Sequence, residues 1–310
     1  MPFWDTWDAQ NAQHGPITLP RMESVSVPST SWVLLAVGVG AASTAAILVR
    51  YATDAEPMAL SFWRCAGAAA ALAPFAGRRL REMDGAARVP AFSGLFLALH
   101  FATWITSLRL TTVAASSLLV STTPIFVALG AWLLWGERLP SKAWAGIGAT
   151  VVGVALVGGG GLAGSSLLGN SLALVGGAAA AGYAITGRRA RLVMGTLEYA
   201  VIAYAAAAAA LLVACLATGA ALGGYDAPTW AGVAGLVVGP QLLGHTLINF
   251  ALRDIDVVSV WIAVMAEPVI ATVLALLLLN EVPPPLVMPG GLLLMAGIYV
   301  VLSSQASARS

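Results

Sequence analysis

The sequence predicts an all-α polytopic membrane protein whose ten transmembrane helices form two inverted five-helix repeats around a central cavity. Three observations predict this fold class. The composition is too apolar for a soluble domain, ten apolar segments are long enough to cross a bilayer, and the two halves of the chain coincide when one is shifted by 144 positions.

Composition excludes several classes of protein. Of the 310 residues, 59% are hydrophobic and 9% are charged, and the mean hydropathy is +0.87. A soluble domain carries about a quarter charged residues, so most of this surface never meets water. The net charge of +1 offers nothing that would attract nucleic acid. Cys65 and Cys215 lie in separate apolar segments, so we interpret them as core residues and predict no metal and no cofactor.

The apolar segments have the length of membrane spans. The bilayer core is about 30 Å thick, so a spanning helix needs roughly 20 apolar residues. We expect spans at 31–49, 57–77, 91–108, 113–135, 143–161, 169–187, 196–218, 228–252, 257–279 and 286–303. The predicted organisation is a disordered cytoplasmic tail at 1–30, a first repeat at 31–161, a second repeat at 166–303 and a cytoplasmic tail at 304–310.

Lys and Arg predict the orientation, because they are enriched in cytoplasmic loops. Two arginines, Arg50 and Arg109, lie on one side of the expected spans, and Arg64 lies within a span. The opposite side collects the other twelve, namely Arg21, Arg78, Arg79, Arg81, Arg88, Arg138, Lys142, Arg188, Arg189, Arg191, Arg253 and Arg309. We therefore expect a multi-pass protein of a bacterial-type inner (plasma) membrane with both termini in the cytoplasm.

The internal repeat is carried by residues that seldom coincide by chance. The matching pairs are Pro124 with Pro268, Glu137 with Glu281, Pro140 with Pro284, Gly146 with Gly290, and Gly153 with Gly297. Each half holds five expected helices, and an odd number forces the second half to cross the membrane upside down. Inverted repeats of this kind place the substrate near the midplane, between the halves.

Three prolines lie inside expected spans. Pro124, Pro240 and Pro268 each remove a backbone hydrogen bond, and such interrupted helices line the binding sites of carriers. We predict that these prolines act as helix breaks or hinges.

The repeated pattern resembles the EamA-domain proteins of the drug/metabolite transporter superfamily. The residues that carry the resemblance are the Ser116, Pro124, Glu137, Gly146 and Gly153 set and its counterpart Ser259, Glu267-Pro268-Val269, Glu281, Gly290 and Gly297. The resemblance covers nearly the whole chain after Thr30. It implies two inverted five-helix halves around a central cavity and a role in metabolite export. The overall pattern is most similar to the branch that includes the YddG-type aromatic amino-acid exporters.

Helix three carries one set of candidate binding residues. His100, Thr103, Trp104 and Ser107 follow one another at helical spacing, so they share a face. An imidazole, an aromatic ring and two hydroxyls suit a pocket for an amphiphilic solute. The alternative is a histidine that only packs against a neighbouring helix.

Further polar side chains lie at membrane depth, where they are costly and usually face the bundle interior. Gln241, His245 and Asn249 recur every four residues after Pro240, and Glu267 precedes Pro268. Each could line the cavity or join helices, and we assign Gln241, His245 and Glu267 to the cavity but not Asn249. The remaining predicted lining residues are Thr123, Tyr183 and Trp261.

Other charged residues receive structural interpretations. Arg64 lies about two turns into the second span, and we expect it to reach the interface or to pair with Asp54 or Glu56. Glu137 and Glu281 stand at span ends, where we expect them to hold loops.

These residues favour a secondary carrier of amino acids or similar metabolites over other functions. Export of lipophilic cations is the alternative, since Trp104, Trp261 and Glu267 suit a cation as well. Phosphorylated substrates are disfavoured because no lysine lies at mid-span. An enzyme is disfavoured because the sequence lacks a His-Glu-x-x-His motif and paired intramembrane aspartates. The partners expected are a small-molecule substrate and lipid, and the oligomeric state stays open.

Overall fold

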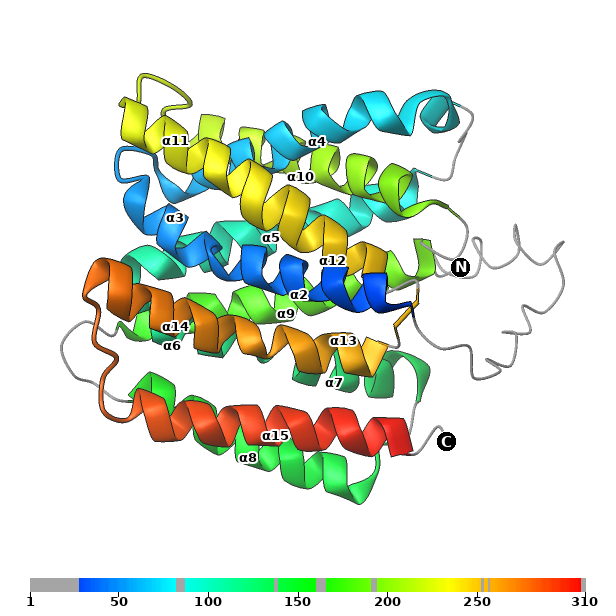
Figure 1. The fold of residues 1–310 in the computed structure, drawn as a ribbon, viewed down its shortest axis with the longest axis vertical. Coiled ribbons are helices and arrows are strands. Elements are labelled where there is room, and N and C mark those ends of the chain that lie inside the picture. The colour runs from blue at the N-terminus through cyan, green and yellow to red at the C-terminus, as the bar shows by residue number, and fades with distance from the viewer. Residues whose placement is uncertain are drawn as a thin grey trace, which may run out of the picture.

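The computed structural model describes residues 28–81, 87–136, 139–159, 166–190, 194–251, 254–255 and 257–307. Within these ranges the chain is helical and forms no strand. The helices run roughly side by side as one bundle, with α8 and α15 at one edge and α4, α10 and α11 at the other (Figure 1).

The first half contains five spans, two of which are interrupted. The spans are α2 (Ser29–Ser43) with α3 (Ala45–Tyr51), α4 (Pro57–Arg81), α5 (Arg88–Leu110), α6 (Val113–Val120) with α7 (Thr123–Trp135), and α8 (Ser141–Gly159). The break between α6 and α7 falls directly before Pro124, so the proline that predicted a break occupies the first turn of α7.

The second half also contains five spans. They are α9 (Leu167–Ala190), α10 (Thr196–Thr218), α11 (Ala227–Leu236) continued by η2 (Val237–His245) and α12 (Thr246–Ala251), α13 (Val257–Val264) with α14 (Ala266–Leu279), and α15 (Val287–Ser307). Pro268 follows the break between α13 and α14, as predicted. Pro240 lies inside η2, which is a nine-residue π-helix rather than a break.

The helices have the dimensions of membrane spans. Among the described residues, nine helical segments are long and apolar enough to cross a bilayer, and Ser141–Val157 is a shorter apolar helix. The described structure therefore confirms the all-α polytopic fold. The helix bounds agree with the expected spans to within a few residues, because uninterrupted apolar runs of this length have no other way to satisfy their backbone in lipid.

The crossing of α8 and α15 shows that the two halves are inverted. A Cβ atom on Gly146 would lie 2.7 Å from the carbonyl oxygen of Gly297, and one on Gly153 would lie 2.8 Å from that of Gly290. The order of contacts reverses between the two helices, so the last helices of the two halves are antiparallel. Glycine permits this close approach of two backbones. The four glycines of the repeat thus pack crosswise within one chain, each against the glycine that belongs to the other repeat pair.

The backbone repeats as well as the sequence. Gly136 ends α7 at φ 64° and Asn280 ends α14 at φ 52°, and the two residues are 144 positions apart. Both helices therefore end in a left-handed residue, a conformation that glycine adopts freely and asparagine tolerates better than most residues.

Hydrogen bonds join the two halves at both ends of the bundle. At the end where α3 and α14 stop, the Arg50 Nη2 donates to Glu281 Oε2 at 3.2 Å, while Glu281 Oε1 accepts from the Val113 backbone N–H at 2.5 Å. We call this the Arg50–Glu281 clasp. At the other end, Ser31 Oγ donates to Asp254 Oδ2 at 2.6 Å, and we call this the Ser31–Asp254 clasp.

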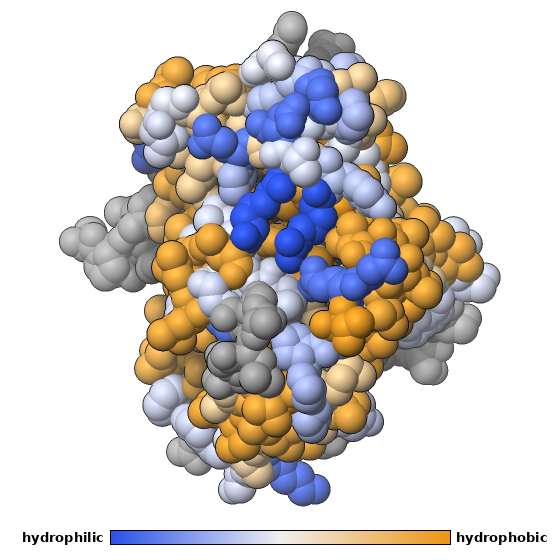
Figure 2. All heavy atoms as spheres, turned by 90° about the vertical axis from the view of Figure 1, so that its left-hand side faces the viewer, coloured by the Kyte–Doolittle hydropathy of each residue, from blue (hydrophilic) through white to orange (hydrophobic). Residues whose placement is uncertain are grey.

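The Arg50–Glu281 clasp confirms the expectation that Glu281 holds a loop. Its counterpart Glu137 lies outside the described residues. The end of the bundle that carries this clasp carries a group of hydrophilic side chains at its centre, with apolar residues beside them (Figure 2).

Candidate functional site

A central cavity lies between the two halves, at the depth of the helix breaks. It holds about 840 Å³ of empty space, counting the part open to the outside. Its lining comes from Ala42, Ala45, Arg64, His100, Trp104, Val120, Ser121, Thr123, Pro124, Ala180, His245, Ile248, Trp261, Val264, Met265 and Glu267. A mostly apolar wall with a few polar groups is typical of small-molecule pockets, and this lining has that composition.

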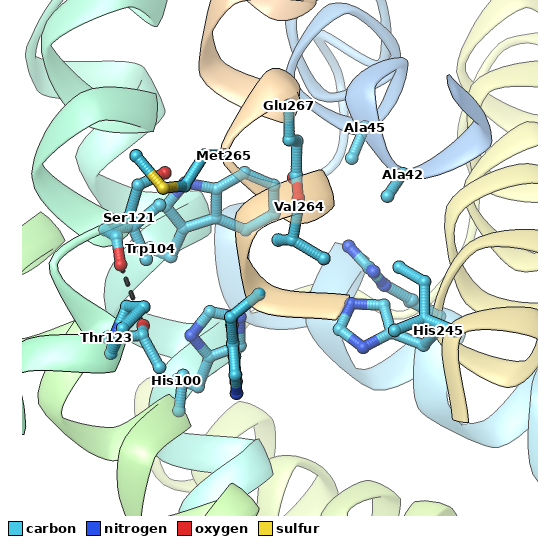
Figure 3. A pocket seen from close by; sticks show the side chains of 16 residues that line it. Ala42, Ala45, His100, Trp104, Ser121, Thr123, His245, Val264, Met265 and Glu267 are labelled. Carbon is cyan, nitrogen blue, oxygen red and sulfur yellow. Dashed lines mark hydrogen bonds between the residues drawn. The ribbon is translucent and has the colours of Figure 1, made fainter. Parts of the chain in front are cut away.

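Most of the predicted binding residues meet at this cavity. Six of the nine line it, namely His100, Trp104, Thr123, His245, Trp261 and Glu267. Figure 3 shows that Trp104, Thr123 and His100 lie on one side of the space, His245 lies on the other, and Glu267 lies between them. Pro124 also belongs to the lining, whereas Pro240 and Pro268 do not.

His100 is held in place by its neighbours on α5 and α9. Its Nδ1 lies 2.9 Å from the Gly176 carbonyl oxygen, so this nitrogen carries the proton and donates. The imidazole also stacks on Trp104, with 5.9 Å between ring centroids and 5° between ring planes. The hydrogen bond and the ring stacking therefore fix the orientation of the imidazole beside the cavity.

Arg64 corrects the structural interpretation drawn from the sequence. It does not reach the interface or pair with Asp54 or Glu56. The residue is 1% exposed, its Nε donates to Gln241 Oε1 at 2.5 Å, and it lines the cavity. Its Cζ lies 4.0 Å from the centre of the Phe101 ring, an arrangement typical of a cation–π contact. The expectation failed because α4 turns Arg64 towards α5 and η2, which sequence spacing alone does not reveal.

Gln241 is the acceptor for Arg64 instead of a lining residue. It is 0% exposed and lies in η2, four positions before His245. Residues four apart share a face in an α-helix, but a π-helix bonds i to i+5 and winds more residues into each turn. His245 therefore reaches the cavity while Gln241 contacts the guanidinium behind it.

Two other predicted lining residues lie elsewhere. Thr103 donates its hydroxyl to the Leu99 carbonyl at 2.8 Å and packs near Gly176 of α9. Tyr183 lies deeper between helices, with its ring centroid 5.9 Å from that of Tyr199. Both side chains join α5, α9 and α10, so the structure assigns them to helix packing beside the cavity.

The lining of the cavity follows the internal repeat. Val120, Ser121 and Thr123 line the cavity from the first half, and Val264, Met265 and Glu267 occupy the same three positions in the second half. The shift of 144 that pairs Pro124 with Pro268 therefore also pairs the linings. The predictions from single helices contained Thr123 and Glu267, which the shift relates to each other, but neither Ser121 nor Met265.

Thr123 and Glu267 differ in how they are bonded. Thr123 Oγ1 donates towards the Val120 carbonyl at 2.8 Å and the Gly177 carbonyl at 3.1 Å. Within the described part of the chain, no hydrogen bond or salt bridge holds the Glu267 carboxyl group. The same ranges contain no group of three His, Cys, Asp or Glu side chains that could hold a metal ion.

An inverted bundle of membrane-spanning helices with a cavity between its halves is the architecture of many transporters of small substrates. The comparison with protein families agrees with this class. Residues 30–159 and residues 167–303 each match the model of the EamA-like transporter family. The chain therefore belongs to the EamA-like transporter family, and through it to the drug/metabolite transporter superfamily.

Comparisons with individual proteins add support for the fold alone. One solved structure, titled "Crystal structure of protein", superimposes with a TM-score of 0.63 and 21% sequence identity. The match covers 91% of this chain and 98% of that chain. No curated protein matches the sequence.

Proposed function

We propose that the protein is a secondary transporter that exports amino acids, aromatic ones among them, by alternating access. The observation that carries the proposal is the composition of the central cavity. Arg64 supplies a positive charge from the first half, Glu267 supplies a carboxyl group from the second half, and aromatic rings lie beside both. A free amino acid has a carboxylate that complements Arg64, an ammonium group that complements Glu267, and a side chain that can pack on the rings.

Aromatic side chains fit the apolar part of this wall. Trp104, stacked with His100, and Trp261 are flat rings, and aromatic pairs gain about 0.5–1.5 kcal/mol beyond the burial of area. The polar groups then orient the solute, while the rings set the preference for large apolar side chains. This favours the aromatic amino acids within the proposed class.

The two repeats, at 31–161 and 166–303, are the proposed moving units, and both termini are proposed to lie in the cytoplasm of an inner-membrane protein. The cavity is lined by both repeats, so a movement of one against the other alters access to it. The sequence has no Walker A motif, so the proposed driving force is the substrate gradient or protons.

Efflux of lipophilic cations is the second candidate. Glu267 and the two tryptophans would suit a cation. The buried guanidinium of Arg64 in the same wall opposes it, because like charges repel strongly where water is excluded.

Counterflow in proteoliposomes tests the proposal. The purified protein is reconstituted, and uptake of radiolabelled Phe, Trp, Thr, Met, Glu and Lys is measured with and without a pH gradient. We expect saturable uptake of Phe and Trp that exceeds that of Lys, with protein-free liposomes as the control. If a folded protein takes up none of them but takes up tetraphenylphosphonium, the cation candidate replaces the amino-acid proposal.

A further inference from the structure

We propose that Arg64 binds the carboxylate of the transported substrate, that the Trp104 indole N–H supplies a second donor to it, and that Gln241 is the positioning residue of this anion site. The inference rests on the proposed function and deepens it, since it assigns one end of the substrate to one wall of the cavity.

The hydrogen bond of Arg64 uses its Nε and leaves the two terminal nitrogens for a ligand. Nε donates to Gln241 Oε1 at 2.5 Å, and the guanidinium lies over the Phe101 ring at 4.0 Å. Its Nη1 is buried and has no hydrogen-bond partner. Because Gln241 and Phe101 fix the plane of the guanidinium, the remaining N–H groups are oriented before any ligand arrives, which reduces the cost of binding.

Trp104 offers a second unpaired donor in the same wall. Its Nε1 is likewise buried without a partner, the residue is 5% exposed, and its ring centre lies 6.0 Å from Arg64 Cζ. Buried donors are almost always paired in folded proteins. Two unpaired donors on adjacent residues that line one cavity point to an acceptor that occupies the cavity.

Glu267 is the acidic residue whose charge acts on Arg64, but the two side chains form no salt bridge. Buried charges are normally paired, because an unpaired one is costly. In the described part of the chain, no carboxylate oxygen lies within 4.0 Å of the Arg64 guanidinium, and the one salt bridge found there joins Arg50 to Glu281. The guanidinium is therefore available for an anionic group of the substrate.

The surroundings favour a carboxylate over a phosphate. Phosphate recognition uses several fixed cations, whereas Arg64 is the one Lys or Arg in this lining. Glu267 lines the same cavity and would repel a doubly charged anion. A zwitterion meets both groups with opposite charges, which binds its carboxylate to the first half and its ammonium group to the second.

A ligand series on the unaltered protein provides the first test. Phenylalanine, N-acetylphenylalanine, phenylalaninamide and phenethylamine compete with labelled phenylalanine in proteoliposomes, and each is tested for thermal stabilisation of the detergent-purified protein. We expect phenylalanine to compete best, and N-acetylphenylalanine to compete and stabilise more weakly because it offers no ammonium group to Glu267. The amide and the amine should bind about 10- to 100-fold more weakly than phenylalanine, the usual loss for a hydrogen bond to a charged group. If the amide competes as well as phenylalanine, the proposal is wrong.

Variants locate the site. Arg64→Gln should raise KM for phenylalanine about 10- to 100-fold, and leave the inhibition constant of phenylalaninamide unchanged. Trp104→Phe keeps the ring and should raise the same KM less. Gln241→Met should raise KM for phenylalanine at near-normal kcat, whereas a merely structural role would lower the amount of folded protein. The exposed Arg88→Gln is the matched control for loss of an arginine.

The outcomes separate this inference from the proposed function. If phenylalanine is carried and Arg64→Gln weakens phenylalanine and its amide equally, the carboxylate site is wrong and the amino-acid function stands. If amino acids are not carried but N-acetylphenylalanine stabilises the unaltered protein and not Arg64→Gln, the carboxylate site stands and the amino-acid function falls. If Arg64→Gln does not fold, the ligand series alone decides.

Discussion

The crossing of α8 and α15 and the central cavity are both built from positions that the internal repeat relates, but the two regions differ in how similar the related residues are. At the crossing, the positions related by the repeat hold identical residues, Gly146 with Gly290 and Gly153 with Gly297, and in space Gly146 contacts Gly297 while Gly153 contacts Gly290. In the cavity, the paired positions hold different residues, with Ser121 opposite Met265 and Thr123 opposite Glu267 in the repeat register. Symmetry is kept in one region and lost in the other.

The difference follows from what each region contacts. At the crossing each half contacts the other half, so both helices need the same small residue for the same close approach. The cavity faces a solute, and a small molecule with unlike ends has no two-fold symmetry. A cavity that binds such a solute therefore needs different side chains at the two positions that the repeat relates.

The largest expected effect comes from breaking the symmetric region. Gly153→Leu places a side chain where a Cβ alone would lie 2.6 Å from the Leu294 backbone nitrogen and 2.8 Å from the Gly290 carbonyl oxygen. Backbone cannot yield as a side chain does, so we expect a loss of about 3 kcal/mol or more, seen as little folded protein by size-exclusion chromatography. Gly148→Leu on the same helix meets nothing within 4 Å and should fold normally. Equal behaviour of the two variants would contradict the packing described here.

The second effect removes the asymmetry of the cavity. Glu267→Thr gives both halves threonine at this position. Because no hydrogen bond or salt bridge holds Glu267 in the described residues, we expect the melting temperature to stay within a few degrees of the unaltered protein. Transport of phenylalanine should fall about 10-fold or more, measured as kcat/KM in counterflow. A loss of stability with normal transport would assign Glu267 to packing instead.

A third effect concerns the Arg50–Glu281 clasp, which joins the halves without facing the solute. Both side chains are partly exposed, at 28% and 20%, so the ion pair itself contributes about 1 kcal/mol or less. Glu281→Gln keeps an acceptor for the Val113 N–H and should lower thermal stability slightly, by a few degrees. The coupling between Glu281→Gln and Arg50→Gln in a double-mutant cycle measures the pair, and complete additivity of the two variants would deny it.

The smallest effect tests the first-half side of the lining. The Thr123 hydroxyl is already bonded to the Val120 and Gly177 carbonyls, so it is a structural group that happens to border the cavity. Thr123→Val should cost about 1 kcal/mol of stability and change KM for phenylalanine by less than about threefold. A large change in KM with unchanged stability would show that Thr123 contacts the solute as Glu267 does, and would contradict the asymmetry described for the cavity.

The sequence predicted the spans well because each is a long apolar run bounded by charges or turn residues. Pro124 and Pro268 also indicated the two helix breaks, since proline cannot donate the bond that would continue the helix. Six predicted residues lie at the cavity because polar groups at membrane depth are rare enough to be informative.

The failures have a common physical cause. Arg64 was assigned to the interface because a long side chain near a span end usually reaches water. Its true direction depends on how α4 packs against α5 and η2, which is a property of the tertiary structure. The spacing of four puts Gln241 and His245 on one face only if the helix has α-helical winding. Pro240 indicates an irregularity in the helix, but it does not indicate that the irregularity is a π-helix.

The two clasps have a consequence for the order of events in transport. In this structure the Arg50–Glu281 clasp and the Ser31–Asp254 clasp are both closed, and each joins the first half to the second. Separation of the halves at either end must therefore rupture the bonds found there. One clasp is a partly exposed ion pair that salt screens, and the other is a single hydroxyl–carboxylate bond. Raising the ionic strength should therefore weaken the Arg50–Glu281 clasp more than the Ser31–Asp254 clasp. Salt added on one side of the membrane thus becomes a means of testing which end of the bundle limits the rate of transport.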